Sequence, residues 1–246
     1  CWIGENTEEN LIMERMRTWI DGFIIKKYQV TVGNYLEFLN DLVQQGREDL
    51  ATTYEPKQIS TASSGKDILG ESLFGRDEEG TYHLKPDTEG HMWELDWPMM
   101  MINFHSACGY AAWYSEKTGK KWRLPFELEW EKAARGVDRR MFPWGNHFDH
   151  NWANVYQYKG ALNISVGKSY PSSIFSFETD VSPYGVRGMS GNFRDWTGSV
   201  FSLDGPDCRG KRYQEDLEDE PHINRSTRGG YWSGTVNHSI LYRRTS

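Results

Sequence analysis

Cysteine is scarce in this chain of 246 residues, and the three that occur are Cys1, Cys108 and Cys208. An odd number of widely separated cysteines excludes a disulfide framework, and no CxxC or CxxH spacing indicates a zinc site. Sparse, unpaired cysteine is typical of a reducing compartment, so we expect a cytoplasmic protein. Because the chain starts at Cys1 without a methionine or a leader, we interpret it as part of a longer polypeptide.

Long apolar runs and an excess of positive charge are also lacking. No segment approaches the ~18 consecutive apolar residues that a membrane helix needs, so we expect no membrane span. The chain has 28 Lys and Arg against 35 Asp and Glu, a net charge of −7. Neutralising phosphates requires a basic face, so this balance argues against nucleic acid as a partner.

Common catalytic motifs are absent as well. The sequence contains no GxSxG, Walker A, GxGxxG or HExxH pattern, which removes the usual hydrolase, nucleotide-loop and metalloprotease interpretations. Of seven histidines, only His147 and His150 lie close together. We interpret them as solvated or locally hydrogen-bonded side chains.

Two acidic groups have an equally simple interpretation. Glu127, Glu129 and Glu131 alternate along a predicted helix and therefore do not share one face, so we expect a solvated helix flank. The run Glu215–Glu220 could gather a cation, but an exposed loop of mutually repelling charges is the simpler interpretation.

Aromatic residues and glycine are what the chain has in quantity. Phe, Tyr and Trp make up 14% of the residues, and there are 24 Gly. Such an aromatic content argues against disorder, and frequent glycine predicts short elements joined by turns. The length fits one irregular domain.

Hydrophobic spacing predicts a strand over residues 19–25 and a helix over 32–43. Thr31 is the expected N-cap of this helix, and Gly46 ends it. Residues 47–92 are polar and contain many glycines, which predicts a long surface insertion.

Two more helices are predicted further along. One begins after Asn103 and stops at Gly119, and the next opens with Pro125 and ends at Gly136. No later segment has helical spacing. Helices early in the chain and irregular β structure late predict an α+β domain.

A glycine-rich turn is the strongest candidate for a metal site. Gly191-Asn192 exposes backbone carbonyls, and the carboxylate of Asp195 follows three residues later. Ca²⁺ takes six to eight oxygen ligands, often carbonyls with one or two acids. The alternative is a tight turn locked by Trp196, and the spacing alone leaves both open.

Five blocks of sequence, in the same order, resemble the formylglycine-generating (sulfatase-modifying factor) family. The first block, Tyr28-Gln29-Val30-Thr31 with Tyr35 and Phe38, is similar to YPVTxxxYxxF. The remaining blocks are Arg123–Gly136 (RLPTEAEWEKAARG), Phe142–Asn146 (YPWGN), Ser182–Trp196 (NxYGLYDMxGNVWEW) and Arg228–Trp232 (RGGSW). The resemblance spans nearly the whole chain. It implies a single α+β domain over residues 1–246, with a C-type-lectin-like core and little regular secondary structure.

The resemblance does not extend to the residues that carry the family's oxidase chemistry. The active enzyme places two copper(I)-binding cysteines after its RGGSW block, and soft thiolates are what Cu(I) requires. The matching positions here are Gly234 and Ser239. We therefore expect no copper and no formylglycine-generating activity. The alternative is an oxidoreductase of the same family with altered chemistry. An iron site would need a histidine-bearing helical domain that this chain lacks.

Calcium is the cofactor that the resemblance still implies, in a structural role. By match, Gly191 and Phe193 would supply carbonyls and Asp195 a carboxylate. A second site would use Asn154 and the carbonyl of Val155. Gly188 stands where the family has Asn or Asp and has no side chain to offer.

The finer pattern resembles domains appended to bacterial serine/threonine kinases and the variable proteins of diversity-generating retroelements. In the latter, residues after RGGxW bind the ligand. We therefore expect a non-catalytic module that binds an unidentified protein or small molecule. The resemblance to the kinase-appended domains implies that the module is fused to a kinase domain. The alternatives are an ordinary surface strand and a domain that mediates oligomerisation. The predicted ligand-binding residues are Tyr231, Trp232, Ser233, Thr235, Asn237, His238, Ser239 and Arg243.

Overall fold

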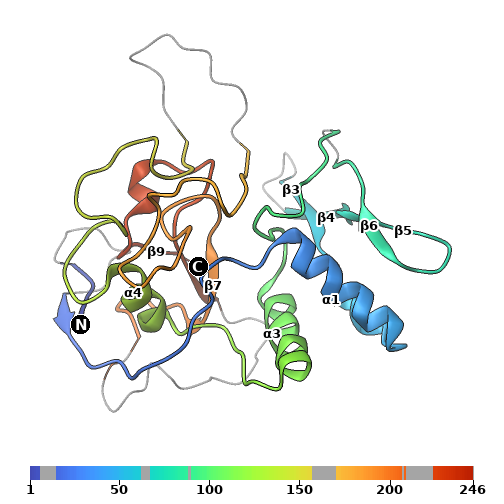
Figure 1. Cartoon of the computed structure of the whole chain (residues 1–246), viewed down its shortest axis with the longest axis horizontal. Coiled ribbons are helices and arrows are strands. Elements are labelled where there is room, and N and C mark those ends of the chain that lie inside the picture. The colour runs from blue at the N-terminus through green and yellow to red at the C-terminus, as the bar shows by residue number, and fades with distance from the viewer. Residues whose placement is uncertain are drawn as a thin grey trace, which may run out of the picture. The chain divides into compact units, whose positions relative to one another are not determined.

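A computed structural model describes residues 1–5, 15–61, 67–87, 90–156, 170–206, 208 and 224–245. Contacts within the chain group it into two compact units (Figure 1). One unit combines Cys1–Gln29 with Leu124–Ser246, and the other is Val30–Arg123. The single-domain organisation stays a prediction. The acidic run Glu215–Glu220 lies outside the described residues.

The unit Val30–Arg123 is built on two capped helices, α1 (Val32–Gln44) and α3 (Phe104–Thr118). Thr31 caps α1 through a reciprocal pair of hydrogen bonds with Asn34, and Asn103 accepts the Ser106 amide at 2.8 Å. Gly119 ends α3 in the left-handed conformation. These caps confirm both predicted helix starts.

An aromatic core joins the two helices. The rings of Phe38 and Tyr110 meet edge to face at 5.6 Å between centroids, and Trp113 lies 5.3 Å from Phe38. All three side chains are buried. Edge-to-face aromatic contacts add to the stabilisation that burial already provides.

The polar segment 47–92 carries more regular structure than its composition indicates. Its buried residues include Ala51, Leu73, Phe74 and Tyr82. The Asn40 side chain of α1 exchanges two hydrogen bonds with the Tyr82 backbone, which ties the segment to the helix. Its elements are α2 (Glu48–Thr53), β3 (Lys57–Thr61), β4 (Asp67–Ser72), β5 (Phe74–Arg76) and β6 (Tyr82–Leu84).

The other unit places helix α4 (Glu127–Arg135) beside a small antiparallel sheet. The sheet has the order β7-β8-β9. Gly136 ends α4 with φ +74°, as the sequence predicts. The strands are β7 (Asp195–Val200), β8 (Arg225–Arg228) and β9 (Arg244–Thr245). The same unit also contains β1 (Trp2–Ile3), β2 (Met16–Arg17) and the 3₁₀ turn η2 (Val236–Ser239).

The predicted strand over residues 19–25 is wrong. This stretch has no regular secondary structure and pairs with no strand among the described residues, and Trp19 and Ile24 are 76% and 89% exposed. Ile20 is buried, and Phe23 and Ile25 pack against the core around Trp130. The apolar spacing therefore marks anchors for an irregular segment.

The interpretation of Glu127, Glu129 and Glu131 as a solvated flank is also wrong, since all three are buried. The Glu129 carboxylate accepts the Phe126 amide at the start of α4, at 2.8 Å. The other two pair with arginines. Spacing along one helix could not reveal this, because most of the partners come from distant strands.

Those arginines form a buried ionic network between α4 and the sheet. Arg228 contacts Glu127 at 3.1 Å and Glu131 at 2.6 Å. Arg244 donates to both oxygens of Glu127. Arg135, one turn along α4, contacts Glu131 at 2.7 Å. The network fixes the helix against β8 and β9, and so positions the loops on either side of these strands.

Candidate functional site

The loop before β7 holds the predicted calcium ligands. Asn192 takes a left-handed φ of +68° and is buried. Its side chain accepts the Ser172 amide at 2.9 Å and donates to the Ser172 carbonyl at 2.8 Å. Its own amide donates to the Asn154 carbonyl at 2.8 Å. The structure thus brings together the two regions named for the separate calcium sites.

Asp195, at the start of β7, is half-buried against Gln29 and Trp130. The Gln29 amide donates to Oδ1 at 3.0 Å, and the Trp130 indole donates to Oδ2 at 2.8 Å. Burial raises the pKa of Asp195 to about 6, and the two hydrogen bonds oppose that rise. Both carboxylate oxygens are therefore already paired with nitrogen donors.

These residues do not fit a calcium ion as they are arranged. The Gln29 Nε2 that donates to Asp195 also donates to the Phe193 carbonyl at 2.7 Å. A neutral amide thus satisfies the two oxygens that the resemblance assigns to the ion.

The second set fits no better. The Asn154 side chain directs Nδ2, a donor, toward the Tyr170 carbonyl and the Asn192 side-chain oxygen. Val155 is buried. Among the described residues, no group of three or more His, Cys, Asp or Glu side chains is placed to hold a metal ion.

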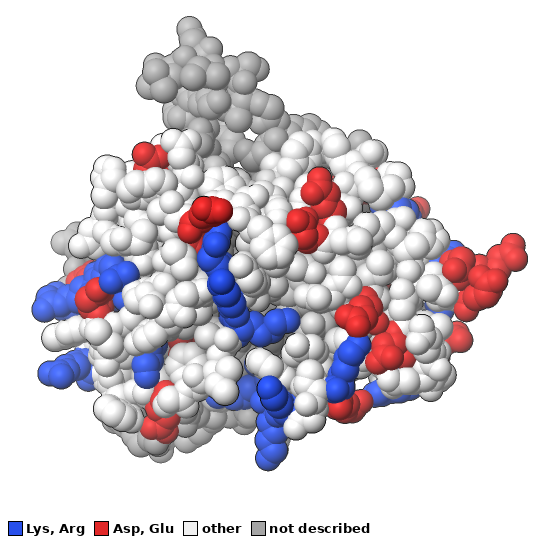
Figure 2. Space-filling view, in the orientation of Figure 1, with Lys and Arg blue, Asp and Glu red and all other residues white. Residues whose placement is uncertain are grey.

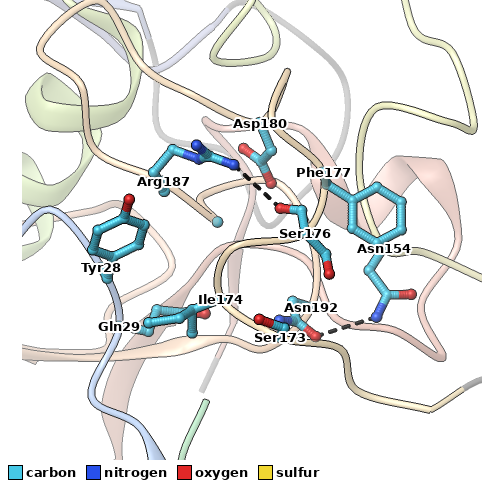
Figure 3. A pocket seen from close by; sticks show the side chains of 11 residues that line it. Tyr28, Gln29, Asn154, Ser173, Ile174, Ser176, Phe177, Asp180, Arg187 and Asn192 are labelled. Atoms are coloured by element: carbon cyan, nitrogen blue, oxygen red, sulfur yellow. Dashed lines mark hydrogen bonds between the residues drawn. The ribbon is translucent and has the colours of Figure 1, made fainter. Parts of the chain in front are cut away.

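A small cavity opens beside this loop (Figure 3). Its walls include Gln29, Asn154 and Asp180, and its volume of about 10 Å³ suits roughly one water molecule. Burial raises the pKa of Asp180 to about 7, against the amides of Ser190 and Met189 that it accepts. The Arg187 guanidinium donates to the Ser176 carbonyl at 3.3 Å. The space is too small for a substrate.

The two positions that match the copper ligands are closed. A side chain at Gly234 would meet the Tyr231 ring at 2.6 Å. Ser239 is fully buried, and its carbonyl accepts the Ser190 hydroxyl at 2.9 Å. Burial also corrects the prediction that Ser239 faces a ligand at the surface.

The remaining predicted ligand-binding residues do lie at the surface of this unit. Ser233, Thr235 and Asn237 are exposed. The partly exposed members are Tyr231, Trp232, His238 and Arg243. Around them the structure builds a group that we call the aromatic–basic cluster, made of Phe193, Arg194, Tyr231, Trp232, His238 and Arg243.

Ring contacts hold the aromatic–basic cluster together. Phe193 stacks on Trp232 at 5.3 Å between centroids, and Tyr231 meets His238 edge to face at 5.3 Å. His238 Nδ1 accepts the Thr235 amide at 3.2 Å. Burial first, then Arg194 and Arg243, lower the pKa of His238.

Sequence reasoning missed Arg194. The signal was present, because Arg194 stands where the GNVWEW block of the family has its first tryptophan. Its guanidinium lies 4.3 Å from the centre of the Tyr231 ring.

One face of the molecule shows how its charges are distributed. On the face shown in Figure 2, acidic and basic side chains are scattered over a largely uncharged surface, with no extended basic patch. Within the described residues, no helix is both long and apolar enough to cross a bilayer.

Comparison with known proteins supports the resemblance seen in the sequence. A curated relative, the inactive C-alpha-formylglycine-generating enzyme 2 of Mus musculus, is 31% identical over 126 residues, which cover 47% of this chain and 36% of that protein. The serine/threonine-protein kinase pkn1 of Chlamydia pneumoniae is 27% identical over 136 residues, covering 55% of this chain and 19% of the kinase. The chain thus spans well under half the length of these relatives.

A solved structure shows the same fold. Variable protein 1 of Treponema denticola superposes with a TM-score of 0.57 at 15% identity, covering 100% of this chain and 85% of that one. The mixed helices and small sheets of the present structure agree with this α+β fold. The sulfatase-modifying factor enzyme 1-like domain matches residues 3–246. The chain therefore belongs to the formylglycine-generating-enzyme-like family of sulfatase-modifying factor domains.

Proposed function

We propose that this chain is a non-catalytic ligand-binding module, and that its binding surface is the aromatic–basic cluster with the exposed residues Ser233, Thr235 and Asn237. One observation carries the proposal. The segment that bears the copper cysteines in the active enzyme here presents exposed side chains around stacked rings, while Gly234 and Ser239 leave no thiolate.

The composition of the surface suits recognition. Tyr and Trp supply large, rigid contact area, while Ser, Thr and Asn supply adaptable hydrogen bonds. The stacked pair Phe193–Trp232 and the contact between Tyr231 and Arg194 hold the rings in place before any ligand arrives. A preorganised surface loses less entropy on binding.

The same reasoning extends to the parent protein. The kinase relative and the variable-protein neighbour support a role as the sensory or variable part of a larger bacterial protein. We place that protein in the cytoplasm. An oxidoreductase with altered chemistry is the competing function.

A triple substitution tests the binding surface. An unbiased screen with the folded chain first returns a ligand, and the variant Tyr231→Ala, Asn237→Ala, His238→Ala is then compared with wild type. We expect binding to be lost while the melting temperature stays within a few degrees, because surface changes usually cost under ~0.5 kcal/mol each.

The matched control changes the same residue types elsewhere in the same unit. Tyr184, Asn151 and His150 are exposed and lie outside the aromatic–basic cluster. Their replacement by alanine should leave binding unchanged. If wild type and the first variant bind the ligand equally well, the binding site lies elsewhere on the chain. Stoichiometric copper or iron in the purified protein would favour the oxidoreductase.

A further inference from the structure

Arg194 is a partly buried cation whose Nε lacks a hydrogen-bond acceptor among the residues that the structure describes. Its guanidinium lies against the Tyr231 ring, and its Nε is buried with no hydrogen-bond partner. Among the described residues it forms no ion pair. A ring contact stabilises the charge but supplies no oxygen to the N–H donors, and a buried donor left unpaired is costly.

A second arginine adds to the positive charge at this point. Burial lowers the pKa of Arg194, Tyr231 opposes that change, and the neighbouring Arg243 lowers the pKa further. Arg194 and Arg243 also lower the pKa of His238, after burial. The unit thus gathers two arginines on one surface, beside His238, whose lowered pKa leaves it uncharged at neutral pH, although the whole chain carries a net charge of −7. A concentration of like charge costs energy unless an anion relieves it.

We propose that the aromatic–basic cluster binds an acidic side chain, Asp or Glu, of a polypeptide partner, with Arg194 as the residue that receives the carboxylate. A guanidinium presents its donors in a planar fork that matches a carboxylate with two parallel hydrogen bonds. Arg243 has contacts of its own and adds to the field. This inference rests on the proposed function, because it names the chemistry of the ligand for the same surface.

Two features favour a polypeptide over a phosphate-bearing polymer. Arg, Tyr and Trp are the residues that dominate the energy of protein–protein contacts, and they stand together here with exposed Thr235 and Asn237 at the rim. The net charge of −7 disfavours a long phosphate polymer, whose charges extend well beyond the cluster, whereas a carboxylate on a short peptide needs only the local positive field.

The side-chain ¹⁵Nε–H signal of Arg194 provides a direct test. The folded chain, labelled at arginine, is titrated with hexaglutamate peptide, hexaglutamine peptide and inorganic phosphate in separate series. We expect a saturable shift of the Arg194 signal with hexaglutamate alone, weakened by added salt. Arg139, which lies 4.6 Å from the centre of the Trp2 ring, is the internal control and should not shift.

Variants separate a carboxylate receptor from a merely structural arginine. Arg194→Gln should weaken hexaglutamate binding by roughly tenfold, the loss expected for one charged hydrogen-bonding group. Arg194→Lys should retain part of the affinity, and Arg139→Gln should retain all of it. Melting temperatures and amide spectra check that each variant is folded.

Several results would overturn the inference: no shift at Arg194, an equal shift with phosphate or hexaglutamine, or unchanged affinity in folded Arg194→Gln. The proposed function has its own readout, namely loss of the screened ligand in the Tyr231, Asn237, His238 variant. The screened ligand could depend on those three residues yet neither carry an acidic side chain nor compete with hexaglutamate. That result would support the proposed ligand-binding function and contradict the inference that Arg194 receives a carboxylate.

Discussion

The side-chain amide of Gln29 fixes the loop before β7 by two hydrogen bonds. Its Nε2 donates to both the Phe193 carbonyl and the Asp195 carboxylate. A divalent cation would satisfy the same two oxygens by coordination. An amide does so without a metal, and the Trp130 indole completes the carboxylate's partners.

Chelation should therefore leave the stability of the wild-type chain unchanged. We expect equal melting temperatures with EDTA and with millimolar calcium. Gln29→Glu should behave differently, because a second carboxylate would face Asp195 and leave the Phe193 carbonyl without its donor. Calcium at 100 times its dissociation constant would then restore up to ~2.7 kcal/mol.

Gln44→Glu is the matched control, since Gln44 is exposed on α1 and should give no calcium response. A melting temperature of the wild type that drops on chelation would contradict this account. It would place a calcium ion in the protein despite the hydrogen bonds of Gln29.

At the scale of elements, the ionic network is what joins α4 to β8 and β9. Glu127, Glu131 and Arg228 are each almost completely buried. A buried ion pair contributes little net stability compared with an apolar pair, but removing one partner leaves the other charge buried and unpaired. The network therefore fixes which helix meets which strand.

Arg228→Ala should destabilise the fold by about 3–5 kcal/mol, measured by urea unfolding, because Glu127 and Glu131 would lose a shared partner. Lys117→Ala is the control. Lys117 and Glu37 are also 2.6 Å apart but exposed, so the loss should stay below ~1 kcal/mol. Similar losses in the two variants would show that burial of the network is not what matters.

The same network should respond to acid. Burial would raise the pKa of Glu127, but Arg228 and Arg244 outweigh it and hold the pKa below its ordinary 4.5. A carboxyl whose folded pKa is depressed contributes stability above its unfolded pKa and loses it as the pH falls through the folded value. The contribution of Glu127 is therefore complete at neutral pH.

The difference in unfolding free energy between wild type and Glu127→Gln should accordingly be largest at neutral pH. It should shrink as the pH falls below about 4.5, since the protonated glutamate becomes neutral like glutamine. Urea titrations across a pH series measure it. A difference that stays constant down to the acid limit would contradict the ionic role.

At the scale of the whole molecule, the family scaffold is kept while the oxidase positions are not. Gly234 packs against Tyr231, and Ser239 is enclosed beside Ser190. Of the three cysteines, Cys108 lies in α3, whereas Cys1 and Cys208 pack against the apolar group around Ile3 and Phe126. None of the three stands at either position.

Incubation with Cu(I), oxygen and a CxPxR peptide should therefore yield no aldehyde above the blank, as measured by mass spectrometry. Soft thiolates are needed to hold Cu(I), and glycine and serine cannot provide them. An active formylglycine-generating enzyme assayed in parallel is the positive control. Turnover by this chain would refute the non-catalytic assignment.

Much of the fold was predictable because its signals are local. The caps at Thr31 and Asn103 act on amides three residues away, and Gly119 and Gly136 end helices through their own backbone freedom. The family blocks predicted the scaffold. The false strand over 19–25 shows the limit, since strand pairing requires a neighbour that the segment itself does not contain.

The sequence by itself determined the helix ends, the family and the absence of the two copper thiolates. Only the tertiary structure decided that Glu127 is buried against Arg228, 101 residues away, and that Gln29 meets Asp195 across 166 residues. It also brought Arg194 beside Tyr231 and Arg243. The physical reason is that capping acts between near neighbours in the chain. The partner of a buried charge or amide is instead set by how distant segments pack, and one sequence does not state this.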